Sequence, residues 1–260
     1  MIRTVRTITA PLLVFALVGS LAACGTKTKT KTDTPAGDHG GSGTVTTITP
    51  GMLPITPGTS WTVAHFGEGG TTPIDLKVGG PWKITADSDW RIDTSEIVDP
   101  KSVPGIEKFT DVTYVQKGLW EGATRYYPRR LTDKWVTQLG IIEVKGDAVD
   151  VQPYDEPSKF WPLGFTVGQS YTVIDTAEHK VEAKVLAKST ADVPAGAIKD
   201  AFLLRFTDTS KTGKAPSTYY YILAPQVGIV AMIHPVNGNE ASGFTTAHQV
   251  DVLATLPSRK

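Results

Sequence analysis

Hydrophobic and polar residues alternate with a period of two along the second half of the chain. Between positions 180 and 188, an extended chain would carry one face of Val181, Ala183, Val185 and Ala187 and another of Lys180, Glu182, Lys184 and Lys188. A second alternation runs from Gln249 to Ala254. Because successive side chains of a strand point to opposite faces, this pattern predicts antiparallel strands that are packed on one side.

Short runs rich in β-branched and aromatic residues recur from Ser60 onward, separated by Gly, Pro and Asp clusters. The predicted strands are 60–66, 73–78, 82–86, 110–115, 119–127, 135–145, 148–152, 170–175, 180–188, 201–207, 217–223, 228–234 and 245–256. Two-residue hairpin turns are predicted at Gly146-Asp147 and Asn237-Gly238. Residues 87–109 are expected to form loops around a short strand at Glu96–Val98. No window shows a convincing helical period, so the predicted fold class is all-β, with antiparallel strands and little helix.

The start of the chain has a different pattern. Arg3 and Arg6 precede an uncharged apolar run from Ala10 to Ala23. This run of about 14 residues is shorter than the roughly 20 that a membrane-spanning helix needs. A short apolar run behind positive charges is typical of a secretory signal peptide, which we predict for residues 1–23.

The junction Leu21-Ala22-Ala23-Cys24 resembles the lipobox of bacterial lipoproteins. The resemblance implies that Cys24 receives a diacylglycerol and becomes the first residue of the mature chain. Two or more acyl chains hold a protein stably on a bilayer. We therefore expect an exported protein, anchored through Cys24 to the cell membrane or an outer membrane, with its folded part extracytoplasmic. An ordinary secreted protein, cleaved near Ala22 or Ala23, is the alternative.

Composition sets the domain plan. Residues 24–51 are rich in Thr, Lys, Gly and Ser, which predicts a flexible tether behind the lipidated cysteine. We expect one antiparallel β domain over residues 52–257, although the length also allows two small domains. Cys24 is the only cysteine, so no intramolecular disulfide can form.

The charge balance excludes one class of partner. Without Arg3 and Arg6, 24 basic residues stand against 26 acidic ones. This balance lacks the basic excess of a nucleic-acid binder. The hydrophobic content of 40%, with six Trp and eight Tyr, is that of a folded protein.

A longer resemblance covers about residues 157–235. Its segments are Phe160-Trp161-Pro162-Leu163-Gly164, Val193-Pro194-Ala195-Gly196 and Tyr219 to Val230. They are similar to a pattern of bacterial envelope β-proteins found in TapB-like families and in relatives of the LolA/LolB lipoprotein carriers. Ala197-Ile198 and Gln226 depart from that pattern. The resemblance implies a strongly curved antiparallel sheet, a half-barrel or open barrel, whose concave face can hold an apolar chain.

Catalytic motifs are absent from the folded part of the sequence. It contains no Gly-x-Ser-x-Gly, no His-Glu-x-x-His and no Gly-rich loop ending in Gly-Lys-Ser/Thr. If Asn237-Gly238 forms the turn, His234 and His248 do not become a metal pair, whereas a longer loop through Ser242-Gly243 would change the register. Scattered acids such as Glu121, Glu143, Asp155 and Glu156 suggest no defined catalytic pair. We expect neither catalytic residues nor a cofactor or metal.

Aromatic residues are the remaining candidates for a site. In a strand, Tyr219 and Tyr221 share one face, and Tyr220 takes the other with Ile222. Such residues either fill a β core or line a ligand groove. The possible ligand-lining residues are Trp135, Trp161, Tyr219 and Tyr221. The pair Arg129-Arg130 could meet phosphate or anionic lipid, but a solvated turn is the simpler expectation.

These observations favour a non-catalytic envelope lipoprotein that binds an apolar ligand, such as a lipid, or an envelope protein on a concave sheet. An envelope glycan hydrolase and a purely structural surface or adhesion lipoprotein are the alternatives.

Overall fold

The computed structural model describes residues 46–47, 53–67, 69–120 and 122–259. The predicted signal peptide, the Cys24 lipidation site and most of the predicted tether lie outside the described residues. Gly43–Lys260 form one compact unit. Its only helical elements among the described residues are two 3-10 turns, η2 (Pro100–Ser102) and η3 (Ile106–Lys108), and no helix there is long and apolar enough to cross a membrane. The predicted all-β class is confirmed.

The first strands are short to medium in length. They are β1 (Thr46–Thr47), β2 (Thr59–Phe66), β3 (Thr72–Leu76), β4 (Trp82–Ile84), β5 (Arg91–Val98), β6 (Tyr114–Trp120), β7 (Ala123–Leu131) and β8 (Trp135–Lys145). The later strands include two of 15 residues that form one hairpin. They are β9 (Ala148–Pro162), β10 (Gly164–Phe165), β11 (Ser170–Asp175), β12 (His179–Val193), β13 (Gly196–Ser210), β14 (Ser217–Ala224), β15 (Gly228–Asn239), β16 (Gly243–Leu253) and β17 (Ser258–Arg259).

Seven of the described strands close into a barrel, in the order β15-β14-β13-β12-β4-β3-β16, with β16 returning to β15. Two small strands complete the ring: β4 pairs with β3 and runs parallel to the end of β12. Register shifts at Val185/Ala187 and Ser189/Ala191 mark bulges in β12, which let a long strand bend. The strong curvature expected from the sequence therefore goes as far as closure.

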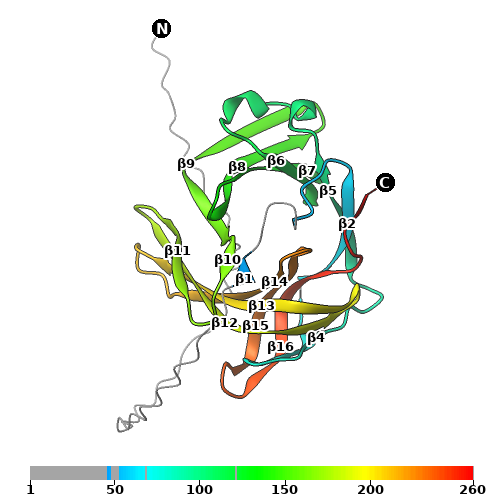
Figure 1. The fold of residues 1–260 in the computed structure, drawn as a ribbon, viewed down its shortest axis with the longest axis vertical. Helices are drawn as coiled ribbons and strands as arrows, with labels where there is room; N and C mark the ends of the chain where they lie inside the picture. Colours follow the sequence, from blue (N-terminus) through cyan, green and yellow to red (C-terminus); the bar gives the residue numbers. More distant parts are fainter. Residues whose placement is uncertain (1–45, 48–52, 68, 121, 260) are drawn as a thin grey trace. The chain divides into compact units, whose positions relative to one another are not determined.

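A six-stranded extension leaves the barrel at β16, in the order β2-β5-β6-β7-β8-β9. We call these strands the arm (Figure 1). Its antiparallel hairpins run from β5 to β9 in chain order. The arm contacts the barrel side through ring pairs, Phe160 of β9 with Tyr221 of β14 and Trp135 of β8 with Tyr171 of β11. One sheet therefore supplies two facing surfaces.

The barrel is filled by apolar side chains. Trp82, Leu76, Ile222 and Ile233 are fully buried within this cluster, and burying each such side chain contributes about 1.5–3 kcal/mol. The arm has a smaller cluster of Val103, Val115 and Ile142. Partly buried residues of the η2–η3 segment, including Ile106 and Phe109, pack against it.

The predicted turn at Gly146-Asp147 is confirmed, because Lys145 pairs with Ala148. The turn predicted at Asn237-Gly238 is wrong: β15 continues to Asn239, which pairs with Gly243. Gly238 has φ 105° and lies directly against the backbone of Gly243. The glycine is needed there for its conformation and for close approach, not for a two-residue turn.

Many other boundaries differ from the predictions; β9, for example, runs to Pro162 instead of ending near residue 152. Three more differences concern β6 and β7, β5, and β1. The predicted strand 119–127 is two strands, because β6 ends at Trp120 and β7 starts at Ala123. The short strand expected at Glu96–Val98 is the end of the eight-residue β5. Strand pairing begins inside the predicted tether, where Thr46–Thr47 pair with Gly164–Phe165. β6 and β7 form a local hairpin in which Trp120 pairs with Ala123. The extent of β5 and the pairing of Thr46–Thr47 depend on partners that are distant in the sequence.

Candidate functional site

Alternation along β14 divides its tyrosines between two surfaces. Tyr220 and Ile222 belong to the core of the barrel, where Tyr220 is only 3% exposed. Tyr219 and Tyr221 lie on the opposite face and keep part of their surface exposed. The division expected from the sequence is thus the one the structure has, and it turns Tyr219 and Tyr221 towards the arm.

Rings from four strands meet on that face, and we call them the aromatic cluster. The ring centroid of Tyr221 lies 4.9 Å from Phe206, 5.9 Å from Tyr219 and 6.2 Å from Phe160. Tyr219 stacks on His234 at 5.2 Å. The cluster comprises Phe160 and Trp161 of β9, Phe206 of β13, Tyr219 and Tyr221 of β14, and His234 of β15.

The phenols of this cluster are crowded by protein although their rings are part-exposed. Desolvation raises the pKa of both Tyr219 and Tyr221 above the usual value. Near Tyr221, the charge of Asp251 also raises the pKa, whereas that of Arg129 opposes the rise. Both tyrosines are therefore neutral hydrogen-bonding groups at physiological pH.

Trp135 and Tyr171 form a second ring pair, with centroids 5.0 Å apart. The Tyr171 hydroxyl is buried without a hydrogen-bond partner, and burial raises its pKa. The ammonium group of Lys159 lies 5.5 Å from the centre of the Trp135 ring. A buried polar group without a partner is uncommon in native proteins, so Tyr171 is a candidate ligand contact.

A small cavity of about 10 Å³ adjoins the cluster at Trp161. Its walls are apolar, and they are formed by Leu53, Trp161, Phe165, Leu223, Ala224 and Gly228. This volume holds one water molecule at most. A lipid chain therefore does not fit in this cavity, and any larger ligand would have to lie along the part-exposed rings.

Arg129 is the main polar residue beside the cluster. It lies in β7 and is 3% exposed, so the expectation of a solvated turn at Arg129-Arg130 is wrong. Its guanidinium carbon lies 4.4 Å from the centre of the Phe160 ring and 5.4 Å from that of Trp161. Arg129 also lies beside Tyr114: burial raises the pKa of the Tyr114 hydroxyl, and the charge of Arg129 opposes the rise. Its Nε atom is buried and has no hydrogen-bond partner.

The other face-sharing residues of β7 are better paired. The Nε atom of Arg125 lies 2.7 Å from a carboxylate oxygen of Glu143. Tyr127 lies near both arginines, and burial raises its pKa while they oppose the rise. Alternation explains why these residues line up, since positions 125, 127 and 129 point to one side of the strand.

Two aspartates flank a histidine on the same side of the sheet. His65 Nδ1 lies 2.7 Å from Asp251, and its Nε2 lies 3.4 Å from Asp93. Arg91 also pairs with Asp93 at 2.9 Å. The imidazole stands between the two carboxylates, with a hydrogen bond to Asp251 and a longer contact to Asp93, so the group links β16, β2 and β5.

His234 and His248 come together, with ring centroids 5.6 Å apart. The longer-loop register considered from the sequence is the one present, because His234 pairs with Gln249. Burial, and then His248, lowers the pKa of His234 to about 4. Within the described residues, however, no group of three His, Cys, Asp or Glu side chains could hold a metal ion.

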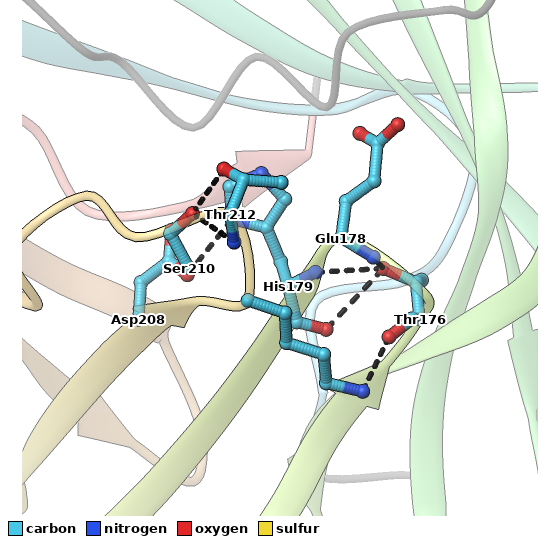
Figure 2. Close-up of polar contacts among 7 residues, drawn as sticks. Thr176, Glu178, His179, Asp208, Ser210 and Thr212 are labelled. Atoms are coloured by element: carbon cyan, nitrogen blue, oxygen red, sulfur yellow. Dashed lines mark hydrogen bonds and ion pairs between the residues drawn. The ribbon is translucent and has the colours of Figure 1, made fainter.

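Figure 2 shows a separate polar cluster at the turn that leads into β12. His179 Nδ1 lies 3.2 Å from Asp208, and the Thr176 hydroxyl accepts a hydrogen bond from the backbone N–H of His179 at 3.1 Å. The hydroxyl of Ser210 is engaged with Thr212 at 2.7 Å rather than with the imidazole. These hydrogen bonds stabilise the turn. None of them joins the Ser210 hydroxyl to the imidazole of His179, as activation of a nucleophile by a histidine would require.

All four residues proposed from the sequence lie on or beside these ring pairs: Trp161, Tyr219 and Tyr221 in the aromatic cluster and Trp135 against Tyr171. Sequence reasoning missed Phe160 and Tyr171 and assigned Arg129 to a turn. The strand predicted at 119–127 ended two residues before Arg129, and no alternation of apolar and polar residues along 123–131 marks its continuation.

Comparison with known proteins gives no relative: no family model, no curated protein and no solved structure matches the chain. The lipobox at Leu21–Cys24 and the resemblance over residues 157–235 therefore stay predictions.

Proposed function

We propose that this chain is a bacterial envelope lipoprotein, exported and anchored to a membrane through a lipid on Cys24. Its β domain acts without catalysis and binds an apolar ligand, of which a lipid is the leading class. The ligand lies along the aromatic cluster between the barrel and the arm. The tether between Cys24 and the β domain gives the domain reach above the bilayer.

The observation that carries this proposal is the contrast within one strand. Tyr220 is buried in the filled barrel, whereas Tyr219 and Tyr221 remain part-exposed among other rings. Trp161 and Phe206 of the cluster are buried like Tyr220, at 6% and 3% exposure, so a ligand would contact the part-exposed rings of Phe160, Tyr219 and Tyr221. Part-exposed aromatic rings offer large apolar contact areas to a ligand at a small cost in side-chain entropy.

The test is native mass spectrometry of the full chain before and after extraction with organic solvent. We expect a bound mass that extraction removes. A Tyr221→Ala variant should lower the bound fraction, because one ring contact contributes about fivefold in affinity. Tyr126→Ala is the matched control, since Tyr126 packs against the Val103–Val115–Ile142 cluster of the arm instead.

An unoccupied mass for the wild-type chain would overturn lipid binding and would favour a protein partner. Equal loss of the bound mass in both tyrosine variants would show that the effect comes from general loosening of the fold.

A glycan hydrolase is the second candidate, and the chain Asp93–His65–Asp251 is the observation in its favour. Glycosidases use two carboxylates on either side of the bond that is cleaved. The imidazole of His65 fills the space between these two, which favours a structural role. Hydrolysis of cell-wall glycan by the wild-type chain, lost in Asp251→Asn, would reverse that conclusion.

A further inference from the structure

Resting on the proposed function, we propose that Arg129 recognises an acidic head group on the bound ligand. The ligand would carry a carboxylate or a phosphate next to its apolar part. Arg129 would bind two of its oxygens, while the apolar part would lie on Phe160, Tyr221 and the rings beyond.

The charge of Arg129 is buried, and no counter-ion accompanies it within the described part of the chain. Among the residues that the structure describes, no carboxylate lies within salt-bridge distance of this guanidinium, and the residue is almost fully buried. A guanidinium group carries a fixed positive charge. Burial of an unpaired charge is strongly unfavourable, and perturbed groups of this kind concentrate at functional sites.

Two aromatic rings fix the orientation of the Arg129 guanidinium group. Phe160 and Trp161 lie against it through cation–π contacts, which use the faces of the aromatic rings. Its Nε–H is left without a partner. The Nε–Nη edge of an arginine is the fork that binds two oxygens of a carboxylate or phosphate. A buried and unsatisfied Nε therefore indicates that one partner of this fork is missing.

The surroundings supply neutral donors but no competing anion. The charge of Arg129 acts to lower the pKa of four nearby phenols, those of Tyr114, Tyr127, Tyr154 and Tyr221. Burial raises the pKa of each of these phenols, so they stay protonated and can donate hydrogen bonds to an anion.

The nearby carboxylates are already engaged by other groups. Glu143 is held by Arg125 at 2.7 Å, and Asp251 by His65 at 2.7 Å. Neither is therefore available to neutralise Arg129.

Arg130 provides the matched comparison in the same strand. It pairs with Asp111 at 3.8 Å, and about a third of its side chain is exposed. Its Nε is buried without a hydrogen-bond partner as well. It nevertheless has a carboxylate and solvent within reach, and it makes none of the ring contacts described for Arg129. Only Arg129 joins an unpaired charge to the aromatic cluster.

The experiment titrates the full chain with three probes that share a ten-carbon chain: decanoate, decyl phosphate and decanol. A fluorinated surfactant keeps the chain in solution, because fluorocarbon mixes poorly with hydrocarbon and so competes little with the probes. Calorimetry gives the affinities, and tryptophan fluorescence, to which all six tryptophans contribute, gives a second record of binding. We expect at least one anion to bind about tenfold to hundredfold more tightly than decanol, the effect of a charge-assisted pair.

Arg129→Gln should remove the preference for an anion over decanol. Arg129→Lys should keep only part of it, because an ammonium group lacks the planar fork. Arg130→Gln should behave like the wild type. If Arg129→Gln fails to fold, Arg129→Lys decides the question: an anion preference that is unchanged in this variant would overturn recognition by the planar fork of Arg129.

The outcomes separate the two proposals. Equal affinity for all three probes overturns head-group recognition but leaves apolar binding in place. An anion preference that survives in Arg129→Gln also overturns it, since another group would then supply the charge. Absence of binding by all three probes overturns the proposed function and this inference with it. A preference for decanoate points to a fatty carboxylate, and a preference for decyl phosphate points to a phosphate-bearing lipid.

Discussion

Replacement of Gly140 with alanine adds a methyl group where β8 faces β9. An ideal Cβ at this position would lie 2.3 Å from the carbonyl oxygen of Gln152, 2.7 Å from a ring carbon of Phe109 and 2.9 Å from the Cα of Pro153. Two of these three atoms are backbone, so they cannot turn away. Ordinary contacts between non-bonded atoms are about 3.5 Å, so the oxygen overlaps the methyl group by roughly 1 Å.

This overlap sets the expected size of the effect. Overpacking costs about 1–3 kcal/mol, and the upper end applies where rigid backbone must move. Gly118→Ala in β6 is the matched control, because its Cβ would lie 3.9 Å from Ser95 and 4.0 Å from Tyr127, at ordinary contact distance. Alanine in a strand is favoured over glycine by about 0.5–1 kcal/mol. The free energies of unfolding of the two variants should therefore differ by about 3 kcal/mol.

Urea unfolding followed by far-UV circular dichroism measures this difference, with the slope required to stay unchanged. Gly140→Ala should also alter near-UV circular dichroism, since β9 carries Phe160 and Trp161 further along. Equal stability of the two alanine variants would refute the reasoning. It would mean that the β8–β9 pair shifts at no cost and that the close approach at Gly140 does not hold β9 in place.

Two further predictions concern the barrel. His234 has a pKa lowered to about 4 by burial and by His248, so the unfolded chain binds its proton more tightly and stability falls as the pH drops from about 6.5 to 4. Between pH 7 and pH 4.5, the free energy of unfolding of His234→Gln, measured with urea, should therefore fall by about 1–2 kcal/mol less than that of the wild type. This difference is smaller than the full pKa shift implies, because the ring is part-exposed. Equal losses in the two proteins would contradict this prediction. Trp82→Phe should lower the free energy of unfolding by about 2–3 kcal/mol. Trp82 lies in β4, which closes the barrel, and its indole N–H donates to the Lys77 carbonyl at 2.7 Å. An unchanged urea midpoint would show that this hydrogen bond is dispensable.

The parts of the fold that were predictable from the sequence are those that local alternation controls. Val181, Ala183, Val185 and Ala187 are all buried in β12, as their spacing predicts. The same period of two separated Tyr220 from its neighbours correctly. A strand with one buried face must show this spacing, whatever it pairs with.

Pairing over long distances was not predictable in this way. The Asn237-Gly238 turn failed because the same dipeptide that favours a hairpin also suits an irregular strand that approaches another backbone. Closure of the barrel depends on β4, a strand of three residues whose partner on one side lies more than 100 positions away. No local composition marks such a pairing.

The position of Arg129 depends both on local alternation along β7 and on long-range packing between the arm and the barrel. Alternation places residues 125, 127 and 129 on one face of β7, and their polar character alone predicts that this face meets water. The barrel overrides that prediction by bringing the rings of β14 opposite the arm, and burial then makes the same charge costly. A polar stripe that a distant sheet covers is a conflict between local and global structure, and such conflicts persist chiefly where function requires them. In this chain the conflict coincides with the aromatic residues that the sequence singled out, which is why Arg129 and the aromatic cluster are best treated as one site.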